Sequence, residues 1–241
     1  MWPFGSSLAS QVEALRAAER RLLELARTRF EPTSNVEIVP FDTKIPCSVV
    51  PVKSHSCDVH KDAVKDETYV IHAVKVTNSS TAAAVDKTSR APLVMLHGYM
   101  NGACKLSRIL CSSSHARACM SHFSVYKTAA YFYRNFTGLC QYFSTIYSLD
   151  LLGWGLSSRP RFVLKDDKLS TAEDFFVESL EAWRHSNQIE KMTLAGHSLG
   201  GYLGVAYSGE SSNFVVASLS FSGGLLIMCQ SFRMQNDTHN M

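Results

Sequence analysis

Three short apolar runs constrain the fold more than any other feature of this sequence. They are "APLVMLHG" at 91–98, "FSTIYSLD" at 143–150 and "EKMTLAG" at 190–196. Continuous apolar runs of this length are typical of strands that are buried on both faces of a parallel sheet. Between the second and the third run, "STAEDFFVESLEAWRHS" repeats apolar residues at helical spacing. Strand, crossover helix and strand in this order predict a doubly wound, mostly parallel α/β sheet.

Length and composition fit one globular domain of this class. The chain has 241 residues, of which 46% are hydrophobic and 19% are charged, and its net charge is +3. Without runs of lysine or arginine, this small charge argues against nucleic acid as a partner. The seven cysteines are irregularly spaced and include no C-x-x-C pair, so reduced thiols are expected. We expect neither a cofactor nor a metal.

One cluster of potential metal ligands lies in the loop-like segment "KSHSCDVHKDAVKDE" at 53–67, which precedes the three apolar runs. His55, Cys57 and His60 could be drawn as a metal site, but no second cluster accompanies them, so a solvated loop is expected. The start "MWPFGSSLAS" lacks the pattern of a secretory signal, and no stretch is apolar enough to span a membrane. These features predict a cytoplasmic protein, with peripheral attachment to a membrane as an open alternative.

The N-terminal segment has the pattern of an amphipathic helix. Apolar residues recur at spacings of three and four between Ser7 and Phe30, and arginines fill other positions; the apolar residues are Leu8, Val12, Leu15, Ala18, Leu22 and Leu25. One interpretation is a helix packed on the flank of the domain with a solvated charged face. The other is a basic helix that touches an anionic lipid surface. We predict an N-terminal helix region at 1–35 and a partial α/β domain at 36–241.

The motif "AGHSLGG" follows the third apolar run and raises the question of a catalytic serine. Ser198 stands between a predicted strand and a predicted helix, where a strained turn would expose its hydroxyl oxygen. Gly196 and Gly200 lack a Cβ, so the strand and the helix can approach closely; His197 completes the motif. The alternative is a serine that caps an ordinary helix.

A second motif, "HGYMNG", follows the first buried strand. Acyl transfer needs hydrogen-bond donors that point at the developing oxyanion, and backbone N–H groups can supply them. Leu199 would give one donor, and Tyr99 or Met100 after Gly98 would give the other. For His97 itself we prefer a structural role.

A third motif, "DLLGWGLSSRP", follows the second buried strand. Asp150 ends that strand, and Gly153 and Gly155 permit the turn after it. The acid of this kind of triad follows the serine in the chain, whereas Asp150 precedes Ser198. We therefore assign Asp150 an architectural role.

These motifs, together with "LRAAERRLLELARTRF", resemble the α/β-hydrolase-domain subfamily four/five. This subfamily comprises lysophospholipid lipases, related lipase co-activators and reported lysophosphatidic acid acyltransferases. The resemblance covers roughly 8–30, 91–103 and 129–208. It implies the α/β-hydrolase fold and an acylated glycerolipid substrate at a membrane or lipid-droplet surface.

The resemblance also implies roles for the residues of the motifs. Ser198 would be the nucleophile, while His97–Tyr99 and Leu199 would line the oxyanion site. The expected activity is that of a serine hydrolase or acyltransferase on glycerolipid or lysophospholipid esters. The alternatives are a non-catalytic lipid-surface or lipase-regulating module and an inactive truncated isoform, including a fragment without a stable fold.

The sequence departs from the family pattern in two places. Residues 104–128 have neither helical nor strand periodicity, so we interpret them as an insertion, either a splicing or gene-model artefact or a functional lid. After Ser198 the chain is too short for two more strand–helix–strand units of about 30 residues each. Asp237 and His239 lie in a polar tail that cannot orient a triad, and no His-x₄-Asp acyltransferase signature occurs. We therefore expect a fold that is incomplete at the C-terminus, without an identifiable triad acid or histidine. The segment "NFVVASLSFSGGLLIM" at 213–228 indicates one further strand.

Overall fold

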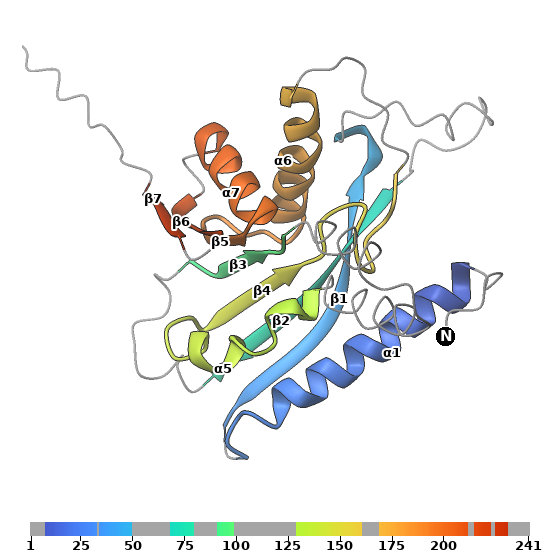
Figure 1. Ribbon diagram of the computed structural model, residues 1–241, viewed down its shortest axis with the longest axis vertical. Helices are drawn as coiled ribbons and strands as arrows, with labels where there is room; N and C mark the ends of the chain where they lie inside the picture. Colours follow the sequence, from blue (N-terminus) through green and yellow to red (C-terminus); the bar gives the residue numbers. More distant parts are fainter. Residues whose placement is uncertain are drawn as a thin grey trace, which may run out of the picture.

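The computed structural model places a seven-stranded sheet between two layers of helices (Figure 1). It describes residues 8–32, 34–49, 68–79, 91–98, 129–160, 169–211, 215–222 and 225–230. The strands are β1 (Val36–Pro46), β2 (Thr68–Asn78), β3 (Leu93–Leu96), β4 (Thr145–Leu149), β5 (Met192–His197), β6 (Val215–Ser222) and β7 (Leu225–Gln230). The helices are α1 (Leu8–Arg27), α5 (Phe136–Leu139), α6 (Leu169–Ser186) and α7 (Leu199–Glu210), with 3₁₀ turns η1 (Cys47–Val49) and η3 (Ala129–Phe132).

The sheet is parallel in its middle and antiparallel at both edges. Its order is β1-β2-β4-β3-β5-β6-β7, and β4, β3, β5 and β6 run parallel to one another. Helix α6 crosses over from β4 to β5, and helix α7 crosses over from β5 to β6, as parallel strands require. At one edge, β1 and β2 pair antiparallel along their whole length, from Val36 opposite Asn78 to Pro46 opposite Thr68. The predicted doubly wound, mostly parallel sheet is confirmed.

The C-terminal end of the sheet differs from the sequence expectation. There, "NFVVASLSFSGGLLIM" indicated one further strand, whereas the structure forms two, β6 and β7. Only residues 223 and 224 separate them, and a connection this short permits only antiparallel pairing.

The core lies on both faces of the sheet, with α6 and α7 over one face and α1, η3 and α5 over the other (Figure 1). Strand β3 shows why its sequence is apolar throughout. Its residues are all buried, with Val94 and Leu96 in the cluster under α6 and α7, and Leu93 and Met95 in the cluster under α1. A strand in the middle of such a sheet has no face exposed to water.

Helix α1 packs on the sheet with a stripe that differs from the predicted one. Leu23 is 1% exposed, whereas Leu25, which was expected on the apolar face, is 51% exposed. The buried stripe runs instead through Leu15, Leu22, Leu23 and Ala26, and it includes a carboxylate, Glu19. The apolar pattern could not reveal this register, because one of its inward positions holds a charged residue.

Several predicted features lie outside the described residues. These are Tyr99, Met100, the segment 104–128, the possible ligands His55, Cys57 and His60, and the pair Asp237 and His239. Over the described part of the chain, no helix is long and apolar enough to cross a membrane. The same residues contain no group of three potential metal ligands placed to hold an ion.

Candidate active site

Ser198 lies alone between the end of β5 at His197 and the start of α7 at Leu199. Its φ of 54° and ψ of −116° fall outside the regions that residues with a Cβ normally occupy. A capping serine has extended backbone angles and accepts a hydrogen bond from the first turn of its helix, but the Ser198 side chain makes no such bond. Ser198 therefore occupies a strained strand-to-helix turn and is not an ordinary helix cap.

The glycines around Ser198 allow β5, α7 and β3 to meet backbone to backbone. A Cβ on Gly196 would stand 2.3 Å from the carbonyl carbon and oxygen of Gly200. A Cβ on Gly200 would stand 2.3 Å from the carbonyl oxygen of Leu96 at the end of β3. No side chain fits at either position, so the close approach of helix and sheet depends on both glycines.

The loop that follows β3 lies directly against Ser198. Strands β3 and β5 are parallel neighbours, with Leu96 opposite Gly196, so their carboxyl ends are adjacent. A Cβ on Gly98 would stand 2.9 Å from the Cβ of Ser198 and 2.7 Å from Nδ1 of His197. The structure thus brings the start of the "HGYMNG" motif and the "AGHSLGG" motif side by side.

Of the two predicted oxyanion donors, the N–H of Tyr99 lies outside the described residues. The Leu199 N–H is in the first turn of α7, where N–H groups have no partner within the helix.

His97 ties the β3 loop to the loop after β4. It is 2% exposed, and the Leu151 N–H donates a hydrogen bond to its Nε2 at 3.2 Å. The proton must then be on Nδ1, which lies 3.2 Å from the carbonyl oxygen of Gly98. Burial lowers the pKa of His97 to about 4 against the opposing effect of the Gly98 hydrogen bond, so the ring is neutral. His97 thus bonds to backbone groups of two loops, and the structural role that the sequence indicates for it stays a prediction.

Asp150 holds the turn that follows β4. Its carboxylate is fully buried, and Oδ2 accepts a hydrogen bond from the Leu156 N–H at 2.7 Å. Gly155 has a φ of +51°, and a Cβ there would lie 2.0 Å from Oδ2. Gly153 has a φ of +89°, which also favours glycine. Burial raises the pKa of Asp150 to about 7, although the charge of His72 opposes this shift. These contacts fit the architectural role that the sequence indicates for Asp150.

The serines at the end of this loop extend the pairing of β2 beyond β4. The Val70 N–H donates to Oγ of Ser158 at 2.8 Å, and the His72 N–H donates to Oγ of Ser157 at 2.9 Å. Ser157 Oγ in turn donates to the carbonyl oxygen of Asp150 at 2.6 Å. The sequence analysis gave these serines no role. Their partners are in a strand more than eighty residues away, so no local signal could have identified them.

Aromatic rings surround the carboxyl ends of the strands. Trp154 meets His97 edge to face with ring centroids 6.1 Å apart, and it lies 5.6 Å from the ring of Phe176 in α6. The ring of Tyr131 lies 5.8 Å from that of His197. Trp154, Phe176 and Leu199 are partly buried and pack against the core under α6 and α7. These rings therefore lie near the carboxyl ends of β3 and β5, where His97 and His197 stand.

The base that would activate Ser198 is not found among the described histidines. No hydrogen bond joins the Ser198 hydroxyl to a residue that the structure describes. His97 bonds to backbone atoms, and His72 bonds to Glu19 and Asp42. Within the same residues, Nδ1 of His197 is buried and has no hydrogen-bond partner.

Comparisons with known proteins identify the family. A model described as the Alpha/beta hydrolase family matches residues 93–237, more than half of the chain. A human 1-acylglycerol-3-phosphate O-acyltransferase ABHD5 is 50% identical over 74 residues, which are 31% of this chain and 20% of that protein. A bovine (Lyso)-N-acylphosphatidylethanolamine lipase is 52% identical over 64 residues, which are 27% of this chain and 18% of that protein.

A longer alignment is found with a probable 1-acylglycerol-3-phosphate O-acyltransferase from rice, 29% identical over 210 residues, or 86% of this chain and 38% of that protein. Among solved structures, the carboxylesterase CesB of Bacillus subtilis has a TM-score of 0.48 and 16% identity, covering 86% of this chain and 47% of that one. The chain thus covers less than half of the length of each of these relatives. The match over strands β3 to β7 shows that the chain belongs to the alpha/beta hydrolase family, and its resemblance to the α/β-hydrolase-domain subfamily four/five is confirmed.

Proposed function

We propose that Ser198 is the nucleophile of a site that transfers the acyl group of glycerolipid or lysophospholipid esters. The observation that carries this proposal is the conformation of Ser198: a positive φ between β5 and α7, with no capping hydrogen bond. Strain of this kind persists where the surrounding structure imposes it, and it is common at functional sites. Gly98, the residue before the proposed donor Tyr99, packs against Ser198, and this contact also supports the proposal.

The reaction proceeds through an acyl-enzyme. Ser198 Oγ forms a bond to the ester carbonyl carbon and gives its proton to a general base from outside the described residues. The Leu199 N–H stabilises the oxyanion, together with the N–H that the sequence analysis assigns to Tyr99. The loss of one such donor typically lowers the rate by about 10²–10³-fold. The ester C–O bond then breaks and the alcohol leaves with a proton. Water or a second alcohol takes the acyl group from Ser198 and returns the hydroxyl.

The names of the relatives and the aromatic rings near the end of β3 support a lipid ester as the substrate. The relatives are named as acyltransferases of 1-acylglycerol-3-phosphate and as a lipase of (lyso)-N-acylphosphatidylethanolamine. The partly buried ring of Trp154 contacts those of His97 and Phe176, so Trp154 and Phe176 offer apolar surface near the end of β3. We also place the reaction on the cytoplasmic side of a membrane or on a lipid droplet.

A fluorophosphonate probe, which reacts with activated serines, tests the nucleophile. We expect an adduct on the parent protein and none on Ser198→Ala. Ser186→Ala is the matched control, because Ser186 is an exposed serine at the end of α6, and it should label like the parent. Labelling that survives in Ser198→Ala, or a folded parent that does not react, would contradict the proposal.

A non-catalytic lipid-surface module is the second candidate. Two observations favour it: the described histidines include no base for Ser198, and α1 exposes Arg20, Arg21 and Leu25 to solvent. Exposed arginines with an apolar side chain fit an anionic interface. A folded parent that binds anionic vesicles but does not react with the probe would support this function, whereas failure to bind vesicles would exclude it.

A further inference from the structure

We propose that His72 is a positioning residue of the candidate site, because it links helix α1 to the loops that hold Gly98 beside Ser198. The inference rests on the proposed function, since it concerns the reactivity of Ser198. It assigns a role to His72, which none of the motifs contains, and to Glu19, for which the sequence analysis gave no role. The link consists of three consecutive sets of contacts.

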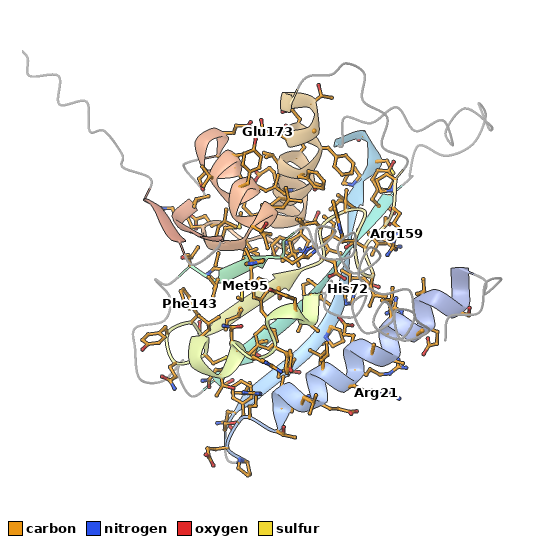
Figure 2. The ribbon with its side chains drawn as sticks, in the orientation of Figure 1. Arg21, His72, Met95, Phe143, Arg159 and Glu173 are labelled. Atoms are coloured by element: carbon orange, nitrogen blue, oxygen red, sulfur yellow. The ribbon has the colours of Figure 1, made fainter. Side chains whose placement is uncertain are left out.

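The first set fixes the side chain of His72 between α1 and β1. His72 is 1% exposed and lies on the face of the sheet toward α1 (Figure 2). Its Nε2–H donates to the Glu19 carboxylate at 3.0 and 3.1 Å, and its Nδ1–H donates to Oδ1 of Asp42 at 2.6 Å. Arg16 of α1 pairs with the other oxygen of Asp42 at 3.6 Å. A ring with carboxylates at both nitrogens is held most firmly as the imidazolium, which donates to both.

The second set joins the backbone of His72 to the loop after β4. The His72 N–H donates to Ser157 Oγ at 2.9 Å, and the Asp150 N–H donates to the His72 carbonyl oxygen at 2.9 Å. Ser157 Oγ closes this arrangement by donating to the carbonyl oxygen of Asp150. The position of this loop therefore follows the position of His72.

The third set carries the constraint to Ser198. Leu151, the residue after Asp150, donates its N–H to His97, which contacts the Gly98 carbonyl oxygen. Gly98 in turn packs against Ser198. Every step from Glu19 to Ser198 is thus a hydrogen bond, a covalent connection or a close packing contact. A displacement of α1 would reach the donors of the oxyanion site, where about 1 Å of misplacement costs roughly 10²-fold in rate.

The groups that face His72 make this link sensitive to alkaline pH. They are Glu19 and Arg16 from α1, Asp42 from β1 and Asp150 after β4. Although burial favours the neutral ring, the hydrogen bond and charge of Glu19, with Asp150 and Asp42, raise the pKa of His72 to about 9. The imidazolium therefore makes its full contribution to the stability of the folded protein below pH 6.5. This contribution is lost as the pH rises through about 9. Ser198 should then lose reactivity over this interval.

The test compares Glu19→Gln and Asp42→Asn with Glu13→Gln, a control on the exposed face of α1. Two quantities are measured: the rate of Ser198 labelling by the fluorophosphonate from about pH 6 to about pH 10, and amide hydrogen exchange at Leu151. We expect Glu19→Gln to slow labelling about tenfold or more and to speed exchange at Leu151. Glu13→Gln should match the parent in both. Asp42→Asn should move the alkaline loss of labelling to lower pH, because it removes a negative charge from beside His72.

The outcomes separate this inference from the proposed function. If the parent does not label, the proposed function fails, while exchange at Leu151 still tests the link. If Glu19→Gln melts cooperatively but labels and exchanges like the parent, the link is wrong. If Glu19→Gln does not fold, the link is tested by Asp42→Asn alone, because the side chain of Asp42 is partly exposed and its replacement disturbs the core less. If Asp42→Asn loses Ser198 labelling over the same alkaline pH range as the parent, the proposal is overturned.

Discussion

At the scale of single residues, the backbone around Ser198 leaves no room for side chains. Ser198 holds a left-handed φ because β5 must end and α7 must begin within one residue. Gly196 and Gly200 permit this by direct backbone contact, while Gly98 makes room for the neighbouring loop. The site therefore depends on the absence of three Cβ atoms as much as on the serine hydroxyl.

The first prediction concerns Gly200. Alanine at this position would place a Cβ 2.3 Å from the Leu96 carbonyl oxygen. We expect Gly200→Ala to destabilise the protein by about 1–3 kcal/mol or more, since packed backbone has to move. Gly209→Ala, also in α7, is the control, because a Cβ there meets nothing within 4 Å and should stabilise by up to ~1 kcal/mol. Denaturant unfolding measures both; equal effects would contradict the close approach.

At the scale of elements, helix α1 is placed by a stripe that is only partly apolar. The sequence predicted the helix and its amphipathic character but put Leu25 on the inner face. The structure buries Leu23 and Glu19 instead, and Glu19 meets His72 of β2. A carboxylate at an inner position cannot be recognised from periodicity, because its partner comes from a distant strand.

The second prediction tests this register of α1. Leu23→Ala removes a side chain that is 1% exposed, and we expect it to lower the free energy of unfolding by about 2–5 kcal/mol. Leu25→Ala removes one that is 51% exposed, and its effect should stay within about 0.5 kcal/mol. Thermal or denaturant unfolding of the two variants provides the comparison. A larger loss for Leu25→Ala would show that the helix is rotated relative to this account.

At the scale of the whole molecule, three loops from the carboxyl ends of parallel strands form one unit. The loops after β3, β4 and β5 are joined by His97, which bonds to Leu151, and by Gly98, which packs on Ser198. Helix α1 reaches the same unit from the other layer through Glu19 and His72. Perturbing this unit should therefore affect global stability as well as the reactivity of Ser198.

The third prediction is a loss of stability in acid that His97 causes. Its pKa is lowered from 6.5 to about 4, so the folded protein keeps the ring neutral while the unfolded chain binds a proton. The neutral ring contributes to the free energy of unfolding above about pH 6.5. This contribution is lost as the pH falls toward 4, and the loss is roughly 3 kcal/mol in total. His97→Gln lacks this titration. The difference in unfolding free energy between the parent and His97→Gln should shrink from pH 7 to about pH 4; a constant difference would refute the assignment.

The sequence alone determined the class of fold and the location of the candidate site. Apolar runs such as 93–96 are typical of strands that are buried on both faces, and glycines around a serine between a strand and a helix indicate a tight turn. Such signals are local, because they depend on solvent exposure and on backbone freedom within a few residues.

Only the tertiary structure decided how these parts are joined. The contacts of His72 with Glu19 and Asp42, of Ser157 with β2, and of His97 with Leu151 link segments that are 30 to 85 residues apart. Pairings of this kind arise from the packing of layers and the order of strands, and the sequence of either partner alone carries no sign of them.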